Sequence, residues 1–400
     1  MRLIVCLVAC AVLSLFVFPF ISPVLAVDAD VNKELQEQKE IIDKLGKRVE
    51  ELENANKAEM ASQSEMDGMV PRFGRNLGAF GDVNYLTDSR EKENKTFSLG
   101  NISLYATGDN NGRLNFLFEM VIEELNDRAV VELERLWVGY AFDDLLIVKA
   151  GRFHTALGYW NIEYHHGKYL FLSVDRPFFL EFEDIGGVMP MHIVGLEVAG
   201  AKKAGEGKFK YMFEIGNGPG LETNADGAAP RDQELIPNAL SDNNDEKQFA
   251  LRLVMDSVLA KGLSLGVSGA KFKIEDSLKT IRVTETIYGV DVHYVKGDLD
   301  LLGEYFRFEN SNEGADAYYA QAAYATGKFT PYLRHERLSS NSADPYLGRL
   351  IGGGARRQNI IGVRYEIDPV YSSLKAQFRR DIARHGDDFD VFEFQWAFHF

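Results

Sequence analysis

The amino-acid sequence predicts an all-β protein, a transmembrane antiparallel β-barrel of about 16 strands preceded by a short α-helical coiled-coil segment. Segments in which apolar and polar residues alternate recur from about residue 79 to the last residue. The connections between these segments are alternately short and long, and the last segment places a row of aromatic residues on one face. Together these observations indicate strands that cross a bilayer as successive hairpins.

Period-two alternation defines the expected strands. Ile102, Leu104 and Ala106 alternate with polar or smaller residues, and the same pattern returns between turns rich in Gly, Asn and Asp. The expected strands cover residues 79–87, 97–107, 113–124, 131–142, 145–154, 192–200, 208–217, 248–256, 263–272, 282–296, 299–309, 317–326, 328–337, 357–367, 372–382 and 389–400. Most have the length that a tilted strand needs to span a bilayer, about 9–11 residues.

The lengths of the connections sort by parity. Turns after even-numbered strands are short, as at Asp143-Asp144 and Gly297-Asp298, whereas segments after odd-numbered strands include 155–191 and 218–247. Transmembrane barrels have short periplasmic turns and longer outer loops, and a soluble sandwich has no reason to sort its loops in this way.

The last expected strand is amphipathic. Phe392, Phe394, Trp396, Phe398 and Phe400 share one face, and Glu393, Gln395, Ala397 and His399 share the other. An aromatic row of this kind suits a lipid-facing strand with an interfacial girdle. The alternative is the edge strand of a soluble sandwich or of an amyloid-like sheet.

Composition fits a folded, acidic, β-rich chain. The 400 residues include 44 Lys and Arg against 60 Asp and Glu, which gives a net charge of −16. This balance argues against a nucleic-acid partner, because neutralising phosphates requires a clustered basic surface. With 36 Gly, 11 Pro and 12% aromatic residues, the chain is typical of β-structure with many turns.

The first residues predict export. A charged start at Arg2, an apolar run and a small-residue site ending at Ala26 form a signal peptide over residues 1–26. The alternative is an uncleaved inner-membrane anchor, because the apolar run nearly reaches spanning length. Cleavage would remove Cys6 and Cys10, leaving a mature chain without thiol chemistry.

Residues 27–57 form the expected periplasmic coiled-coil segment. Leu35, Ile42, Val49 and Asn56 repeat every seven residues, and Leu45 and Leu52 occupy the second position of the seam. We expect a parallel homotrimer, and the alternative is a solvated charged spacer. Residues 58–78 are the linker, and the barrel covers 79–400.

Three short motifs carry a resemblance to a known family. They are Gly151-Arg152-Phe153-His154, Arg176-Pro177-Phe178-Phe179-Leu180-Glu181 and Val194-Gly195-Leu196-Glu197-Val198. With the signal peptide, the heptads and the terminal Phe, they make the chain resemble Gram-negative trimeric porins, in particular the phosphate-selective porin O/P group. The resemblance implies an outer-membrane location with the N-terminal segment in the periplasm.

The resemblance also implies lumenal Arg and Lys residues that bind phosphate, from which the net charge of −16 departs. It further implies that barrel-assembly machinery reads a C-terminal signal comprising Trp396, Phe398 and Phe400.

Alternation places candidate solute-pathway residues on the inner face. The basic ones are Arg252, Arg334, Arg364, Lys375 and Arg379, and the acidic ones include Glu119, Asp291 and Glu304. Rings of charged side chains set ion selectivity in channels, and the Arg fork suits carboxylate or phosphate. A selective anion filter, a transverse field between basic and acidic walls, and a balanced water-filled lumen are the three alternatives.

Residues 155–191 are the expected constriction loop, because a wide barrel must be narrowed. The candidate residues in and beside it are Arg152, His154, Tyr159, Trp160, His165 and His166. A metal site is conceivable there, since His192, Glu163, Glu183 and Asp184 are also near. Neither an H-E-x-x-H helix nor a Cys-based spacing occurs, so hydrogen-bonded histidines without a metal or cofactor are expected.

The predicted function is a passive diffusion channel for small hydrophilic solutes or ions, and not an enzyme. One alternative is a barrel enzyme of the lipase or protease type, which needs a nucleophile and a positioned base at the rim of the barrel. The other is a structural barrel that tethers the envelope or sheathes a partner protein.

Overall fold

Sixteen antiparallel strands close into a barrel within the described part of this computed structural model. Described are residues 74–400 apart from 91–95, 111, 126–127, 166, 182–186, 223–233, 237–244, 276–281, 311–312, 351–352, 370 and 383–386. The predicted signal peptide and coiled-coil segment therefore lie outside the described residues. The predicted fold class, a transmembrane antiparallel β-barrel, is confirmed.

Each barrel strand matches one predicted segment. The strands are β1 (Gly74–Asp88), β2 (Thr96–Asn110), β3 (Leu114–Leu125), β4 (Arg128–Asp143), β5 (Leu146–His154), β6 (His192–Ala204), β7 (Gly207–Asn217), β10 (Lys247–Asp256), β11 (Leu263–Glu275), β12 (Arg282–Lys296), β13 (Leu299–Asn310), β14 (Glu313–Tyr324), β15 (Phe329–Ser340), β16 (Gly354–Asp368), β17 (Ser372–Ile382) and β18 (Phe389–His399). The connections contain α3 (Trp160–Glu163), the 3₁₀ turn η1 (Phe178–Leu180), α4 (Leu347–Leu350) and the hairpin of β8 (Gly220–Glu222) with β9 (Glu234–Ile236).

The largest difference from the expected bounds is at β1, which begins at Gly74 and so includes residues assigned to the linker; β6 ends four residues later than predicted and β14 begins four residues earlier. Gly74 pairs with Asp109 and Gly78 with Tyr105 on β2. The glycine-rich start of this strand offers too few apolar side chains for alternation to reveal it.

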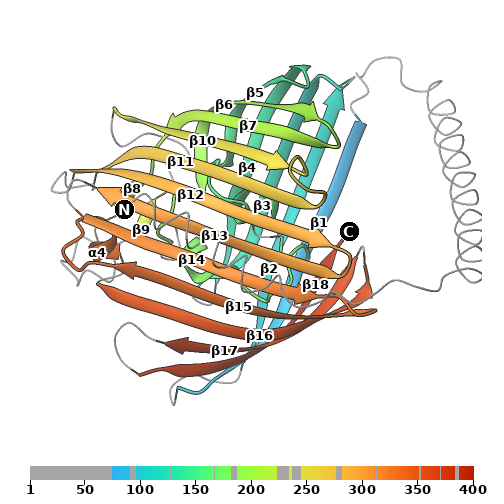
Figure 1. Ribbon diagram of the computed structural model, residues 1–400, viewed down its shortest axis with the longest axis vertical. Helices are drawn as coiled ribbons and strands as arrows, with labels where there is room; N and C mark the ends of the chain where they lie inside the picture. The colour runs from blue at the N-terminus through green and yellow to red at the C-terminus, as the bar shows by residue number, and fades with distance from the viewer. Residues whose placement is uncertain are drawn as a thin grey trace, which may run out of the picture. The chain divides into compact units, whose positions relative to one another are not determined.

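The two ends of the barrel differ as the connections predicted. Strands follow one another in chain order, and β1 closes the barrel against β18 with Phe80 opposite His399. Figure 1 shows α4 and the β8–β9 hairpin at the same end, the end of the long connections. The short connections after β3 and β13 also lie at that end. All the connections are therefore short at one end of the barrel, whereas the other end has both short and long ones.

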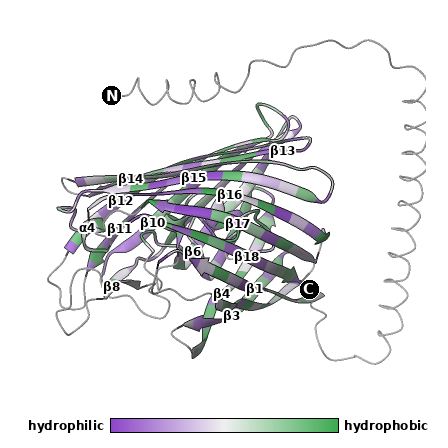
Figure 2. Cartoon of the chain, turned by 90° about the horizontal axis from the view of Figure 1, so that it is seen from below, coloured by the Kyte–Doolittle hydropathy of each residue, from purple (hydrophilic) through white to green (hydrophobic). Residues whose placement is uncertain are grey.

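The outer face is apolar. Leu251 and Leu253 on β10, and Val290 and Val292 on β12, are exposed at alternate positions, and Figure 2 shows green and purple residues alternating along the strands. A contiguous exposed apolar band of this size requires lipid around it. Among the described residues, no helix has the length and hydrophobicity needed to cross a membrane.

The last strand follows the predicted facing. Phe392, Phe394, Trp396 and Phe400 are exposed, whereas Glu393, Gln395 and Ala397 are buried. Phe400 is tied to β1 by two backbone hydrogen bonds with Ala79, of 2.7 and 3.0 Å.

The connection between β5 and β6 fills part of the interior. Its apolar side chains join those on the inner faces of β10 to β15 in one buried cluster. Trp160 lies edge-on to Tyr319 with ring centroids 5.7 Å apart, and Phe179 packs on Phe306 at 6.1 Å. Each fully buried aromatic contributes about 2–3 kcal/mol to holding this connection inside the barrel.

Candidate functional site in the barrel interior

Glu304 on β13 holds the first turn of α3. Its carboxylate accepts hydrogen bonds from the backbone N–H groups of Tyr159 at 2.7 Å and Trp160 at 2.8 Å. The hydroxyl of Tyr319 donates a third bond at 2.8 Å. Gly158 has a φ of +70°, and a Cβ there would lie 2.1 Å from the same carboxylate, so the turn requires glycine. Glu304 thus binds the connection directly.

Two more wall carboxylates repeat this arrangement. Glu214 on β7 accepts from the N–H of Ala156 at 2.9 Å, and Glu336 on β15 accepts from the N–H of Phe178 at 2.6 Å. Buried backbone donors must be paired, and an irregular segment inside a barrel cannot pair them with itself. The inward carboxylates supply that pairing.

The inward cations pair the carbonyl groups of the same connection. Arg334 donates to the carbonyl oxygens of Asp175 at 2.9 Å and Arg176 at 3.3 Å. Its Nε also donates to Glu336 at 2.7 Å, so the guanidinium is shared between the wall and the connection.

Arg364 and Lys375 act in the same way on the neighbouring strands. Arg364 donates to the carbonyl oxygen of Phe171 at 3.0 Å. Lys375 donates to the carbonyl oxygens of Lys168 and Ser173, the latter at 2.8 Å. Lys375 is 1% exposed, so its ammonium is enclosed between β17 and the connection.

A charge network closes this contact toward β1 and β18. Lys168 lies 3.2 Å from Asp82 on β1, and Arg379 on β17 lies 3.5 Å from Asp175 and 3.2 Å from Glu393. Although burial opposes it, the positive charges of Lys168 and Arg379 lower the pKa of Asp175 below its ordinary value. Asp175 therefore stays ionised at neutral pH and keeps its ion pairs with Lys168 and Arg379.

The remaining predicted pathway residues form close ion pairs. Arg252 on β10 donates to Asp291 on β12 at 2.9 Å. Arg252, Glu163 and His293 line a pocket of about 320 Å³ toward the short-turn end, and Tyr159 also reaches this pocket.

A second group of charges lies on β3 to β6, away from the cationic anchors. Glu119 on β3 lies 2.5 Å from Arg135 on β4, and Lys149 on β5 lies 2.7 Å from Glu197 on β6. The side chains of Arg135 and Lys149 are 27% and 24% exposed, unlike the enclosed Lys375. Lys149 also lines a pocket of about 310 Å³ and lies 5.0 Å from the ring centre of Trp137.

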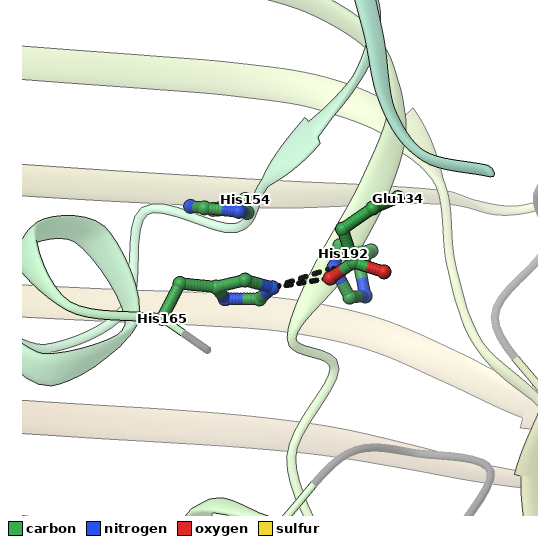
Figure 3. A group of neighbouring side chains, drawn as sticks. All are labelled: Glu134, His154, His165 and His192. Atoms are coloured by element: carbon green, nitrogen blue, oxygen red, sulfur yellow. Dashed lines mark hydrogen bonds and ion pairs between the residues drawn. The ribbon is translucent and has the colours of Figure 1, made fainter. Parts of the chain in front are cut away.

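The structure gathers three of the four candidate histidines. His154, His165 and His192 meet Glu134 of β4 in one buried cluster, shown in Figure 3. Arg152 supports the cluster by donating to the carbonyl oxygen of Glu134 at 3.0 Å. His166, Glu183 and Asp184 lie outside the described residues.

Glu134 and Arg135 were not among the residues predicted from the sequence, although a break in the alternation of apolar residues marks them. Glu119 pairs with Arg135 and Met120 with Leu133, so Glu134 is the extra residue of a β-bulge. Leu133 and Leu136 both face outward and are three positions apart, which breaks the period of two. That break places two successive charged residues on the inner side.

Comparison with known proteins shows the fold. No family model matches the sequence, and no curated protein matches it. The anion-selective porin of Comamonas acidovorans is 12% identical with a TM-score of 0.56, over 82% of this chain and 100% of that chain. The outer membrane channel DcaP of Acinetobacter baumannii is 10% identical with a TM-score of 0.54, over 82% and 97%. OmpT, an outer membrane protein of Vibrio cholerae, is 12% identical with a TM-score of 0.51, over 84% and 100%. The chain therefore has the fold of Gram-negative outer-membrane porins.

Proposed function

We propose that this protein is an outer-membrane porin, a passive diffusion channel for small hydrophilic solutes or ions. The observation that carries the proposal is the combination of an apolar outer face with a charged interior narrowed by one folded connection. Water-filled channels in barrels of this size are built in this way. The proposal gives the interior charges roles in positioning and permeation, and no catalytic role.

The connection 155–191 is the constriction in this proposal. The connection is held by hydrogen bonds that Arg334, Arg364 and Lys375 donate to its backbone carbonyl oxygens. These three cations therefore position the connection and are not the main selectivity filter. The more accessible Arg135 and Lys149 take that role. Small anions, phosphate among them, are the favoured solutes, because an Arg fork and an ammonium both bind oxyanions.

The assembled state follows from parts at the two chain termini. A homotrimer is proposed from the heptads of residues 27–57. OmpT of Vibrio cholerae is known in a trimer form. The exposed Phe400, with Phe398 and Trp396, is the proposed signal for barrel-assembly machinery, and the N-terminal segment is proposed to lie in the periplasm.

Liposome swelling tests permeation directly. Vesicles that contain the heat-modifiable, folded protein and a trapped large dextran are diluted into isotonic arabinose, stachyose or potassium phosphate. Swelling in arabinose and phosphate, with slower swelling in the larger stachyose, is expected. Rates equal to those of protein-free vesicles for every small solute would refute a diffusion channel.

A further inference from the structure

Three strands and the constriction connection meet at one buried point. Glu134 lies at the bulge of β4, His154 ends β5, His192 begins β6, and His165 follows α3 in the constriction connection. One ligand atom from each of the four lies within 4.8 Å of the others, and all four side chains are buried.

The shortest distances converge on a single oxygen. Nε2 of His165 lies 2.5 Å from Oε1 of Glu134, and Nε2 of His192 lies 2.8 Å from the same oxygen. The two nitrogens are 3.0 Å apart (Figure 3). These three atoms form a triangle whose edges, 2.5, 2.8 and 3.0 Å, are shorter than the spacing of about 3.3 Å between ligand atoms on tetrahedral zinc, so the side chains would separate by less than about 1 Å to admit the ion.

Asn161 determines which nitrogen of His165 carries hydrogen. Its amide nitrogen donates to the carbonyl oxygens of Thr155 at 2.9 Å and Met191 at 3.0 Å. Its Oδ1 therefore faces Nδ1 of His165, 2.9 Å away, and can only accept, so Nδ1 is the protonated nitrogen. The Nε2 of a neutral His165 then presents a lone pair to a carboxylate oxygen and to a second imidazole.

Such an arrangement requires a shared cation. A lone pair that faces an anionic oxygen in a buried site is repulsive unless a proton or a metal ion lies between them. Ligating histidines characteristically donate their other ring N–H to an oxygen that fixes the tautomer, as Asn161 does here. In addition, the Nε2 of His154 is buried without a hydrogen-bond partner in the described residues.

We propose that Glu134, His154, His165 and His192 bind one divalent transition-metal ion, most suitably Zn²⁺. Imidazole nitrogens with one carboxylate suit zinc, whereas calcium and magnesium take six or more oxygen ligands. Local spacings alone predicted hydrogen-bonded histidines without a metal, whereas the fold brings these four side chains together from separate segments. Zinc binding at this cluster is independent of the proposed channel activity.

The ion would connect the constriction to the wall. His165 belongs to the connection, whereas the other three ligands belong to the barrel. Metal binding therefore ties the α3 segment to β4, β5 and β6, on the side opposite its anchors at β15 to β17. Removal of the ion leaves the connection held by its anchors on β15 to β17 and by the carboxylates of Glu214 and Glu304.

Zinc binding by the full-length protein is the test. Protein purified without a histidine tag and stripped with a chelator is titrated with Zn²⁺ by calorimetry and equilibrium dialysis, and with Co²⁺ by visible absorption. One Zn²⁺ per chain and the intense visible bands of tetrahedral Co²⁺ are expected. His165→Ala, His192→Asn and Glu134→Gln should each weaken binding at least about tenfold.

His335→Ala is the matched control, because His335 lies beside Asn359 on the outer part of β15 and should bind zinc unchanged. Heat modifiability shows which variants fold, and Glu134→Gln preserves size if a histidine variant does not fold. Heating unfolds the barrel and changes its electrophoretic mobility. Zinc should raise the temperature of this change in the wild type and not in Glu134→Gln. No saturable zinc binding, or binding that the cluster variants leave unchanged, would overturn the proposal and leave a shared proton as the cation.

Discussion

Single inward-facing residues of this barrel bind partners that are distant in the sequence. Glu304 was predicted from alternation to line the solute pathway, and the structure gives it three hydrogen bonds to Tyr159, Trp160 and Tyr319. Alternation can place a side chain on the inner face. It cannot show a partner that is about 145 residues away in the chain.

Replacing Glu304 with Ala should loosen the constriction. The backbone N–H groups at the start of α3 lose their acceptor, a loss of about 1–2 kcal/mol typical of a helix cap. Limited proteolysis near α3 and the urea midpoint of unfolding should both report it. Glu309→Ala, on an exposed position of the same strand, is the control; equal effects in both variants would argue against the capping role.

Glu181 should give the constriction a pH dependence near neutrality. Loss of water around this half-buried side chain raises its pKa from an ordinary value of 4.5 to about 7. A raised carboxyl pKa favours the folded state below about pH 4.5, and this contribution is lost as the pH rises to about 7.

The change should be on the order of 1–2 kcal/mol in the free energy of unfolding between pH 5 and pH 8. Urea unfolding of wild type and Glu181→Gln at both pH values measures it. The histidine cluster titrates in both proteins, so its contribution cancels when the unfolding free energies of Glu181→Gln are subtracted from those of the wild type. An identical pH dependence in the two proteins would contradict the assignment of this titration to Glu181.

Among the elements, the connection between β5 and β6 matters most, because charged side chains of the barrel wall hold it inside the barrel. The constriction was predicted at the long segment 155–191 because a wide barrel must be narrowed, and alternation placed the cations of β15 to β17 on the inner face. Their partners were not predictable, because they are backbone carbonyls of the connection, such as those of Phe171 and Ser173. The spacing of Leu133 and Leu136 indicated the bulge at Glu134. The three histidines that contact Glu134 come from three separate segments, so their clustering could not be predicted from the sequence.

Removing the anchors should widen the pore. In Arg334→Ala with Lys375→Ala the connection loses its main donors on one side and should leave the wall part of the time. Conductance should rise by a factor of roughly two and become noisier, because the barrel itself is wide. Arg307→Ala with Lys271→Ala, outside the anchoring set, is the control pair; a conductance that the anchor variants leave unchanged would place the constriction elsewhere.

At the scale of the whole molecule, the fold was the most predictable property. Alternation and the parity of connection lengths are independent signals: the first predicted about sixteen strands, and the second predicted hairpins that cross a bilayer. Closure follows from the last strand, whose aromatic face is exposed and whose polar face is buried beside β1. The trimer and the coiled coil remain predictions, because residues 27–57 lie outside the described part of the chain.

Ion selectivity should depend on Arg135 and Lys149. Replacing both with Glu changes the charge of the accessible wall by four units and should shift the reversal potential toward cation preference. Arg282→Glu, on an exposed side chain at the long-connection end, changes the net charge without facing the proposed pathway and should have little effect. An unchanged reversal potential in the double variant would remove these residues from the pathway.

The folded barrel should conduct ions once it is inserted in a bilayer. Single-channel recording of the heat-modifiable wild-type protein in a planar bilayer under a KCl gradient measures this. Stepwise conductance in groups of three, with a reversal potential that indicates anion preference, is the predicted result. Persistent silence of protein that is shown to be folded and inserted would contradict it.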